Sequence, residues 1–193
     1  SHDLRTPLTR LKLQLAMVKQ KDISSNMSKD IDEMEGMLND YLQFAKTQTQ
    51  ESSSTIDLSN LFKEIQKDLK NGNLTLINSE KTIITARALS LKRCFENVIN
   101  NGLTYGKKVY VSLHKSSNRI IINIEDDGPG IPEDQHRNVF NPFFRLDKSR
   151  SLNKTGVGLG LAIVEDIINS HGGSINLGKS KRNGLLVKIS LPF

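Results

Sequence analysis

A histidine near the start of the chain is the first residue whose type and setting suggest chemistry. His2 lies in the string SHDLRTP, residues 1–7. Imidazole titrates near neutral pH, and its neutral nitrogen is a nucleophile that can accept a phosphoryl group. Asp3 could hold one ring nitrogen, and Thr6, one helical turn beyond His2, could orient a hydrolytic water. These residues predict a phosphoryl-accepting or hydrolytic site, although a lone histidine near a helix start is also typical of an exposed or capping residue.

Two asparagines form a second candidate site. Asn97 and Asn101 are four residues apart, so in a helix their amides share one face. Buried amides without partners are costly, and Mg²⁺ prefers oxygen ligands such as an amide carbonyl beside phosphate oxygens. The pair predicts a site for metal-bound phosphate; the alternative is that both cap the end of the helix beside Gly102. Tyr105 follows and could pack its ring on a purine.

A carboxylate in a glycine turn forms a third site. Asp126 ends a β-rich run and is followed by Gly128 and Gly130. Its carboxylate could accept a hydrogen bond from an adenine amino group, and the glycines let the backbone turn closely under the base. By itself, this turn is also typical of an ordinary hairpin.

Two further loops complete the candidate pocket. Residues 139–144 (VFNPFF), followed by Arg145, Lys148 and Arg150, predict an aromatic and basic flap, or alternatively a surface loop held by its phenylalanines. Residues 155–160 (TGVGLG) open a predicted helix, where glycine amides and a helix N-terminus could bind a triphosphate. The loop is neither a P-loop nor a dinucleotide-binding fingerprint, since no Lys-Ser/Thr pair follows and its glycines alternate.

The element that must position His2 is a helical hairpin. Apolar residues recur at alternating steps of three and four, which predicts two consecutive helices with one apolar seam each. Two such helices cannot enclose a core alone, so we expect a second copy and a dimeric four-helix bundle; the alternative is a generic coiled-coil spacer. The seam residues are Leu4, Leu8, Leu11, Leu15 and Val18, then Met27, Ile31, Met34, Leu38, Tyr41 and Ala45.

The rest of the chain predicts a second domain of the α+β class. We expect residues 1–50 to form the hairpin, residues 51–56 a polar linker, and residues 57–193 a two-layer α/β sandwich. The helices are predicted at 57–69, 88–103 and 158–170. The strands are predicted at 74–77, 82–85, 109–114, 119–125, 174–177 and 185–191.

The composition of the chain argues against some classes of function. The net charge of +6 suits an anionic partner, but no basic run is interleaved with aromatic residues, so we expect no nucleic-acid binding. No apolar run is long enough to span a membrane, which predicts a cytoplasmic fragment. The single cysteine, Cys94, is predicted to be a small buried hydrophobe.

Together, these motifs resemble the sensor histidine kinases of bacterial two-component systems, and among them the EnvZ-like members. Residues 1–7 resemble their H box, 97–101 the N box, 126–130 the G1 box, 140–144 the F box and 156–160 the G2 box. The resemblance implies a Bergerat-type ATP domain, shared with gyrase and MutL-type ATPases. It implies that His2 is the phospho-acceptor, Asn101 a Mg²⁺ ligand and Asp126 the adenine-binding carboxylate. The implied ATP-binding set further includes Asn97, Tyr105, Gly128, Gly130, Ile131, Arg145, Thr155, Gly156, Val157, Gly158, Leu159, Gly160 and Leu161.

The same resemblance implies a function. The expected activity is ATP- and Mg²⁺-dependent autophosphorylation of His2 in a homodimer, followed by transfer to an aspartate of an OmpR-like response regulator. The longer protein is expected in the bacterial inner membrane. Thr104 departs from the family pattern, which usually has Lys or Arg there; Lys107, Lys108 or Arg145 could supply that contact. The alternatives are a protein acting mainly as a phosphatase of the regulator, or an ATP-gated dimerisation module of the MutL kind.

Overall fold

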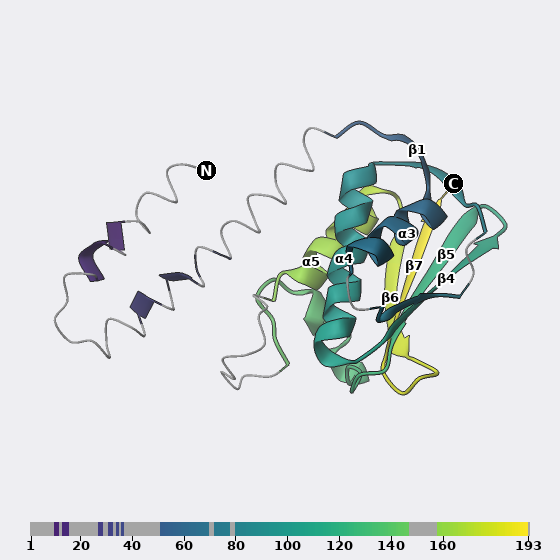
Figure 1. The fold of residues 1–193 in the computed structure, drawn as a ribbon. Coiled ribbons are helices and arrows are strands. Elements are labelled where there is room, and N and C mark those ends of the chain that lie inside the picture. The colour runs from purple at the N-terminus through teal and green to yellow at the C-terminus, as the bar shows by residue number, and fades with distance from the viewer. Residues whose placement is uncertain are drawn as a thin grey trace. The chain divides into compact units, whose positions relative to one another are not determined.

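The chain forms two compact units, residues 1–49 and residues 50–193. The computed structural model describes residues 10, 11, 13–15, 27, 28, 31, 32, 34 and 36 of the first unit. In the second unit it describes residues 51–69, 72–77, 80–146 and 158–192. Figure 1 shows the fold as a ribbon, with the elements of the second unit labelled.

The described residues of the first unit are helical, as the seam pattern predicted. Leu15 and Ile31, one from each predicted helix, are both 6% exposed and belong to one buried cluster. Other seam residues, Leu11, Met27 and Met34, are exposed within the single chain. The single hairpin therefore buries only part of its seam.

The second unit alternates strands and helices around one main sheet. Its first part contains β1 (Ser54–Asp57), α3 (Leu58–Asp68), β2 (Leu74–Leu76), β3 (Ile83–Ala86) and α4 (Ala88–Tyr105). Its second part contains β4 (Val109–Ser116), β5 (Arg119–Asp126), two short 3₁₀ helices (Glu133–Gln135 and Asn138–Phe140), α5 (Gly160–Ser170), β6 (Ser174–Lys179) and β7 (Leu185–Pro192). The order confirms the predicted α+β class.

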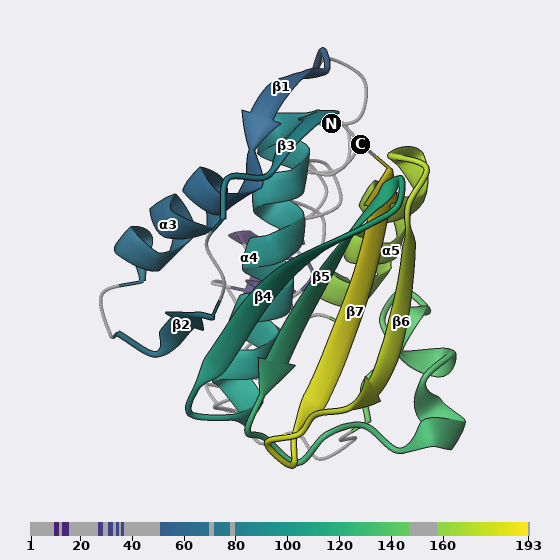
Figure 2. The same ribbon diagram turned by 90° about the vertical axis from the view of Figure 1, so that its right-hand side faces the viewer.

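Five strands form the main sheet in the order β2-β4-β5-β7-β6. All neighbours are antiparallel except β2 and β4, which are parallel, while β1 and β3 form a separate antiparallel pair. Helices α4 and α5 pack on one face of this sheet, and in Figure 2 they lie behind its strands. Because a helix layer covers one face, the fold is the predicted two-layer sandwich.

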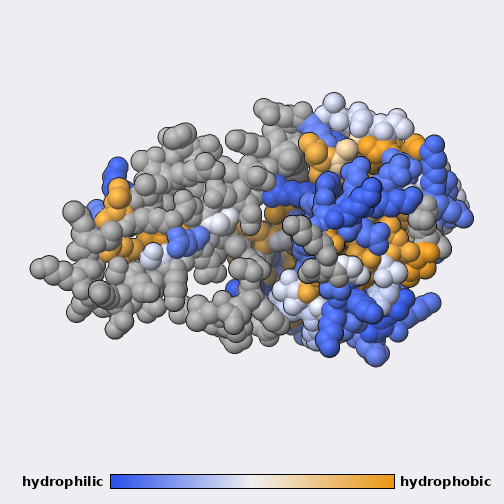
Figure 3. Space-filling view, viewed as in Figure 1, coloured by the Kyte–Doolittle hydropathy of each residue, from blue (hydrophilic) through white to orange (hydrophobic). Residues whose placement is uncertain are grey.

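Buried and more exposed residues alternate along the strands, and the buried ones form the core. In β5, Ile120, Ile122 and Ile124 are buried, whereas the residues between them are half-exposed. Period-two alternation is the pattern of a strand with one face against the core. Phe62 of α3 and Phe95 of α4 pack their rings 4.5 Å apart within that core, and both are nearly inaccessible. Outside, hydrophilic residues cover much of the described surface in Figure 3.

The predicted elements agree closely with the observed ones, with one omission. Helix α3 starts after Asp57, whose Oδ1 accepts a hydrogen bond from the Ser59 N–H and thereby caps it. The omission is β1, which falls largely within residues 51–56, the stretch predicted as a linker. A short polar strand on a two-stranded sheet buries little apolar surface, so it leaves no period-two signal in the sequence. Helix α5 starts at Gly160, two residues later than expected.

Candidate nucleotide-binding site

Asp126 lies at the centre of the candidate site. It is the last residue of β5, it pairs with Val109 at the start of β4, and it is 8% exposed. Its Oδ1 accepts hydrogen bonds from the Gly128 N–H at 2.8 Å and the Leu185 N–H at 3.0 Å. Within the described part of the chain, Oδ2 accepts none. The carboxylate is thus held by one oxygen, and the other is available to a ligand donor.

Helix α4 approaches this carboxylate at Gly102. A Cβ at position 102 would lie 2.7 Å from Cγ2 of Val109, 3.3 Å from Cβ of Asp126 and 3.6 Å from its Oδ2. Any side chain there would push the helix away from the strand ends. Gly102 therefore allows the C-terminal part of α4 to lie directly against the Asp126 carboxylate.

The two asparagines are on α4, as predicted. The helix continues past Gly102 to Tyr105, and Gly106 is its C-cap residue, so the alternative that these amides cap a helix end at Gly102 is wrong. The Nδ2 atom of Asn97 is buried without a hydrogen-bond partner among the described residues. A buried unpaired donor costs about 1–3 kcal/mol, which a polar ligand at this position would recover.

Asp127, which the sequence analysis did not single out, shapes the end of the same helix. Its Oδ1 accepts hydrogen bonds from the backbone N–H groups of Lys107 at 2.7 Å and Lys108 at 2.9 Å. These bonds, first that of Lys108 and then that of Lys107, lower the pKa of Asp127. Asp127 thus fixes the turn between α4 and β4, and no motif in the sequence distinguishes this role from that of an exposed carboxylate.

The β6–β7 hairpin also contributes to the site, and the sequence analysis missed it. A Cβ at Gly184 would overlap with both Oδ1 and the backbone oxygen of Asp126. Only glycine therefore permits the close approach that lets the neighbouring Leu185 N–H reach the carboxylate. The hairpin is 58 residues away in sequence, so its proximity is visible only in the tertiary structure.

The flap and the glycine loop meet through one backbone contact. The Phe143 N–H donates to the Gly158 carbonyl at 3.0 Å. Gly158 has a φ of +77°, and a Cβ there would lie 2.8 Å from the Phe144 carbonyl oxygen. Phe143 itself has a φ of +66° and a largely exposed ring. The two predicted loops are therefore joined at the point where α5 begins, with Leu159 buried as its N-cap residue.

The remaining predicted site residues divide into two groups. Tyr105 is exposed at the end of α4, Arg145 follows the flap, and Ile131 follows the Gly130 turn, where its carbonyl lies 3.0 Å from His136 Nε2. Leu161 lies in the first turn of α5. His2, Asp3, Thr6, Thr155, Gly156 and Val157 lie outside the described residues, so their assigned roles stay predictions.

Among the described residues, no cluster of His, Cys, Asp or Glu forms a metal site, and no helix is long and apolar enough to cross a membrane.

Two family models match the chain. The histidine kinase-, DNA gyrase B- and HSP90-like ATPase model matches residues 86–193, and the His Kinase A (phospho-acceptor) domain model matches residues 1–50. The first match covers more than half of the chain.

Individual relatives agree with these models. Sensor histidine kinase GtrS of Pseudomonas aeruginosa is 34% identical to this chain, over 100% of the chain and 40% of that protein. The ATP-binding domain of PrrB from Mycobacterium tuberculosis superposes with a TM-score of 0.62 at 26% identity, over 74% of this chain and 98% of that one. The histidine kinase domain of the E. coli osmosensor EnvZ gives a TM-score of 0.55 at 34% identity, over 75% of this chain and 91% of that one.

The chain spans less than half the length of the curated relatives that it matches. It nevertheless contains both domain types in the order that the motifs predicted. The chain belongs to the sensor histidine kinase family, and residues 86–193 are its histidine kinase-, DNA gyrase B- and HSP90-like ATP-binding domain.

Proposed function

We propose that this chain catalyses ATP-dependent phosphorylation of His2 and passes the phosphoryl group to an aspartate of a response regulator. The observation that carries the proposal is the geometry of Asp126. This buried carboxylate is held by two backbone N–H groups through Oδ1, while Oδ2 remains beside Gly102. An oxygen acceptor in that position selects adenine, whose exocyclic amino group donates, over guanine, whose O6 would be repelled.

The residues around Asp126 suit the rest of a nucleotide. Asn101 offers an amide oxygen that would hold Mg²⁺, and this ion would neutralise charge on the phosphates. The buried Nδ2 of Asn97 offers a donor. Glycine amides at residues 156–160 and the basic Arg145 are assigned to the triphosphate. In the transfer, the bond from Pγ to the leaving oxygen of ADP breaks and a bond from Pγ to the imidazole nitrogen of His2 forms.

Partners follow from the family. His Kinase A domains dimerise through their helices, and exposed Leu11, Met27 and Met34 on the seam support a homodimer here. We further propose that the response regulator is OmpR-like and that the longer protein is embedded in the bacterial inner membrane. The MutL-like alternative is disfavoured because the His Kinase A model matches residues 1–50.

The test is incubation of the purified chain with γ-labelled ATP and Mg²⁺, beside His2→Ala and Asn101→Ala. The wild type is expected to carry acid-labile, alkali-stable label, and both variants are expected to carry none. ATP binding is measured in parallel: His2→Ala should bind normally. Label that survives in His2→Ala would refute the assignment of the acceptor, whereas absence of ATP binding by the wild type would refute the pocket.

One observation supports the phosphatase alternative as a second activity. Thr104 stands where relatives usually have a basic residue, and its Oγ1 donates to the Asn100 carbonyl at 2.7 Å. The hydroxyl is therefore engaged by its own helix, and it offers no cation to a phosphate. Dephosphorylation of the regulator that persists in His2→Ala and is lost in Thr6→Ala would establish this activity.

A further inference from the structure

The main sheet has a second face that no described helix covers, and Figure 2 looks onto it. The strand register places side chains on this outer face in rows. Tyr110, Glu125 and Leu186 form one row, and Ser112, Asn123 and Lys188 form the next. Their neighbours Asp126, Ile124 and Val187 point to the opposite, helix-covered face.

A groove of about 490 Å³ crosses this outer face. Ser112 lies in its lining and is only 6% exposed, so the larger side chains around it form the sides of a shallow, open groove. Ile77, which is 47% exposed, and Leu186 supply apolar side chains. The remaining lining is polar.

The groove is strongly cationic. Lys179, Lys181 and Arg182 line it, and Lys188 lies in the row beside Ser112 and Asn123. The one carboxylate in its described lining is Glu125, whose Oε2 accepts hydrogen bonds from Ser180 Oγ at 2.9 Å and the Lys181 N–H at 3.1 Å. Three cationic side chains therefore face one carboxylate in the described lining, so the groove carries a net positive charge.

One cation is held in place. The Arg182 guanidinium lies 3.4 Å from the centre of the Tyr110 ring. This cation–π contact orients the charge before any partner arrives. It also covers the only aromatic ring in these rows, so no ring is available for stacking a nucleic-acid base.

We propose that this groove binds an acidic segment of a partner protein. Carboxylates of the segment lie against Lys179, Lys181, Arg182 and Lys188, and its apolar side chains pack on Ile77 at one side of the groove and on Leu186 further across the sheet. The apolar part is too small and too polar at its edges for insertion into a membrane. The groove is separate from the nucleotide site, since Glu125 and Asp126 point to opposite faces of β5.

The test uses the full chain and a fluorescent peptide of alternating glutamate and valine, with binding followed by anisotropy. The chain is expected to bind it saturably, and the double variant Lys181→Glu, Lys188→Glu to bind at least about tenfold more weakly. The matched control is Lys63→Glu, Lys67→Glu, which makes the same charge change on exposed positions of α3 and should bind like the wild type. Thermal melting establishes that both variants are folded, and Lys188→Glu alone serves if the double variant is not.

Three results would overturn the proposal. One is no saturable binding of the peptide. Another is nonspecific attraction. It would be revealed if the control double variant weakened peptide binding as much as Lys181→Glu, Lys188→Glu does, or if a peptide with glutamine in place of glutamate bound as tightly as the glutamate peptide. The third is tighter binding of oligo-dT or of phosphatidylglycerol vesicles that depends on the same lysines.

In NMR spectra, the peptide should shift the amide signals of Ser112, Asn123 and Lys188 and leave those of α3 in place.

Discussion

At the scale of single residues, the two carboxylate oxygens of Asp126 have different roles, one structural and one proposed to bind the ligand. Oδ1 holds the Gly128 turn and the start of β7, whereas Oδ2 lies beside Gly102. This division allows substitutions to separate the two roles. An amide in place of the carboxylate retains an oxygen for the backbone donors and puts an NH₂ group where adenine would donate.

For Asp126→Asn we therefore expect a fold that is nearly unchanged and ATP binding that is strongly weakened. A hydrogen bond to a charged group contributes about 1.5–3 kcal/mol, which corresponds to roughly a ten- to hundredfold loss of affinity. Titration with a fluorescent ATP analogue measures the loss, and thermal melting checks the fold. Unchanged ATP affinity would remove Asp126 from the site.

Gly184→Ala should also weaken ATP binding by about tenfold or more, because the added Cβ overlaps with Asp126 and displaces either the carboxylate or the hairpin. Gly178→Ala is the matched control in β6, since its Cβ would meet only Leu186 Cδ2, at 3.8 Å. The same titration compares the two variants. Equal effects would show that the close approach at Gly184 is unimportant.

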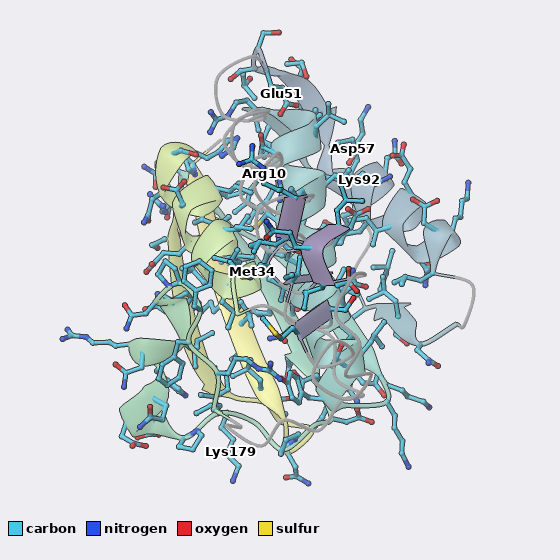
Figure 4. The ribbon with its side chains drawn as sticks, turned by 90° about the vertical axis from the view of Figure 1, so that its left-hand side faces the viewer. Arg10, Met34, Glu51, Asp57, Lys92 and Lys179 are labelled. Carbon is cyan, nitrogen blue, oxygen red and sulfur yellow. The ribbon has the colours of Figure 1, made fainter. Side chains whose placement is uncertain are left out.

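At the scale of elements, α4 joins the two ends of the domain. Its C-terminal half carries Asn97 and Asn101, whereas its N-terminal N–H groups are bound by Glu51. Oε1 of Glu51 accepts from the Leu89 N–H at 2.6 Å, and Oε2 accepts from the Ser90 N–H at 2.9 Å and Ser90 Oγ at 2.7 Å. Figure 4 shows Glu51 and Lys179 at opposite ends of the domain. Because Arg87, the N-cap residue, makes no side-chain capping bond, a residue distant in sequence caps this helix.

Glu51→Ala should destabilise the domain by about 1–2 kcal/mol, as loss of a helix cap does, and lower Tm by several degrees. Calorimetry or thermal circular dichroism measures the change. Glu64→Ala, on the exposed face of α3, is the control and should shift Tm far less. A similar shift in both variants would contradict the capping role.

His171 links the end of α5 to the start of α4. Its Nδ1–H donates to the Ile167 carbonyl at 2.7 Å, and its Nε2 accepts from the Arg87 N–H at 3.2 Å, which requires a neutral ring. Burial, opposed by the Ile167 carbonyl, lowers the pKa of His171 below its usual 6.5. The unfolded state therefore binds the proton more readily, so the stabilisation is complete above pH 6.5 and declines as the pH falls below it.

Denaturant unfolding followed from neutral pH to pH about 5 should show this decline in the wild type and a flatter profile in His171→Gln. His114→Gln, at an exposed position of β4, should keep the wild-type profile. A profile unchanged by His171→Gln would assign the pH dependence to other groups.

At the scale of the whole molecule, the described residues of the first unit leave seam side chains exposed, whereas the second unit encloses its own core. Leu15 and Ile31 are buried in the hairpin, but Leu11, Met27 and Met34 remain exposed. Exposed seam residues of this kind are covered when a second hairpin completes a four-helix bundle.

The double variant Leu11→Glu, Met34→Glu should accordingly convert a dimer into a monomer, because it places charges in the seam between subunits. Leu13→Glu is the matched control: Leu13 is 66% exposed and lies off the seam. Light scattering after size-exclusion chromatography gives the mass of each. A monomeric wild type, or dimers in all three proteins, would refute the predicted interface.

The sequence by itself determined the elements and the order of the motifs. Spacing of three and four in the hairpin, period-two alternation in β5, and the Asp57 cap of α3 are local properties, and local sterics and burial produce local patterns. Asp126, Gly128 and the α4 asparagines were likewise recognisable from residue type and short spacing. Residues 97–101 and 126–130 needed no tertiary information to be proposed as a site.

Only the tertiary structure decided which distant groups meet. Gly184 and Leu185 reach Asp126, Glu51 caps α4, and His171 binds the Arg87 N–H, all across long separations in sequence. Strand β1 was missed because it is short and polar and therefore shows no period-two pattern in the sequence. Such contacts arise from how sheets and helices pack. They require only a small residue or a backbone N–H at the right place, and these groups occur throughout any sequence. No short sequence pattern can therefore predict them.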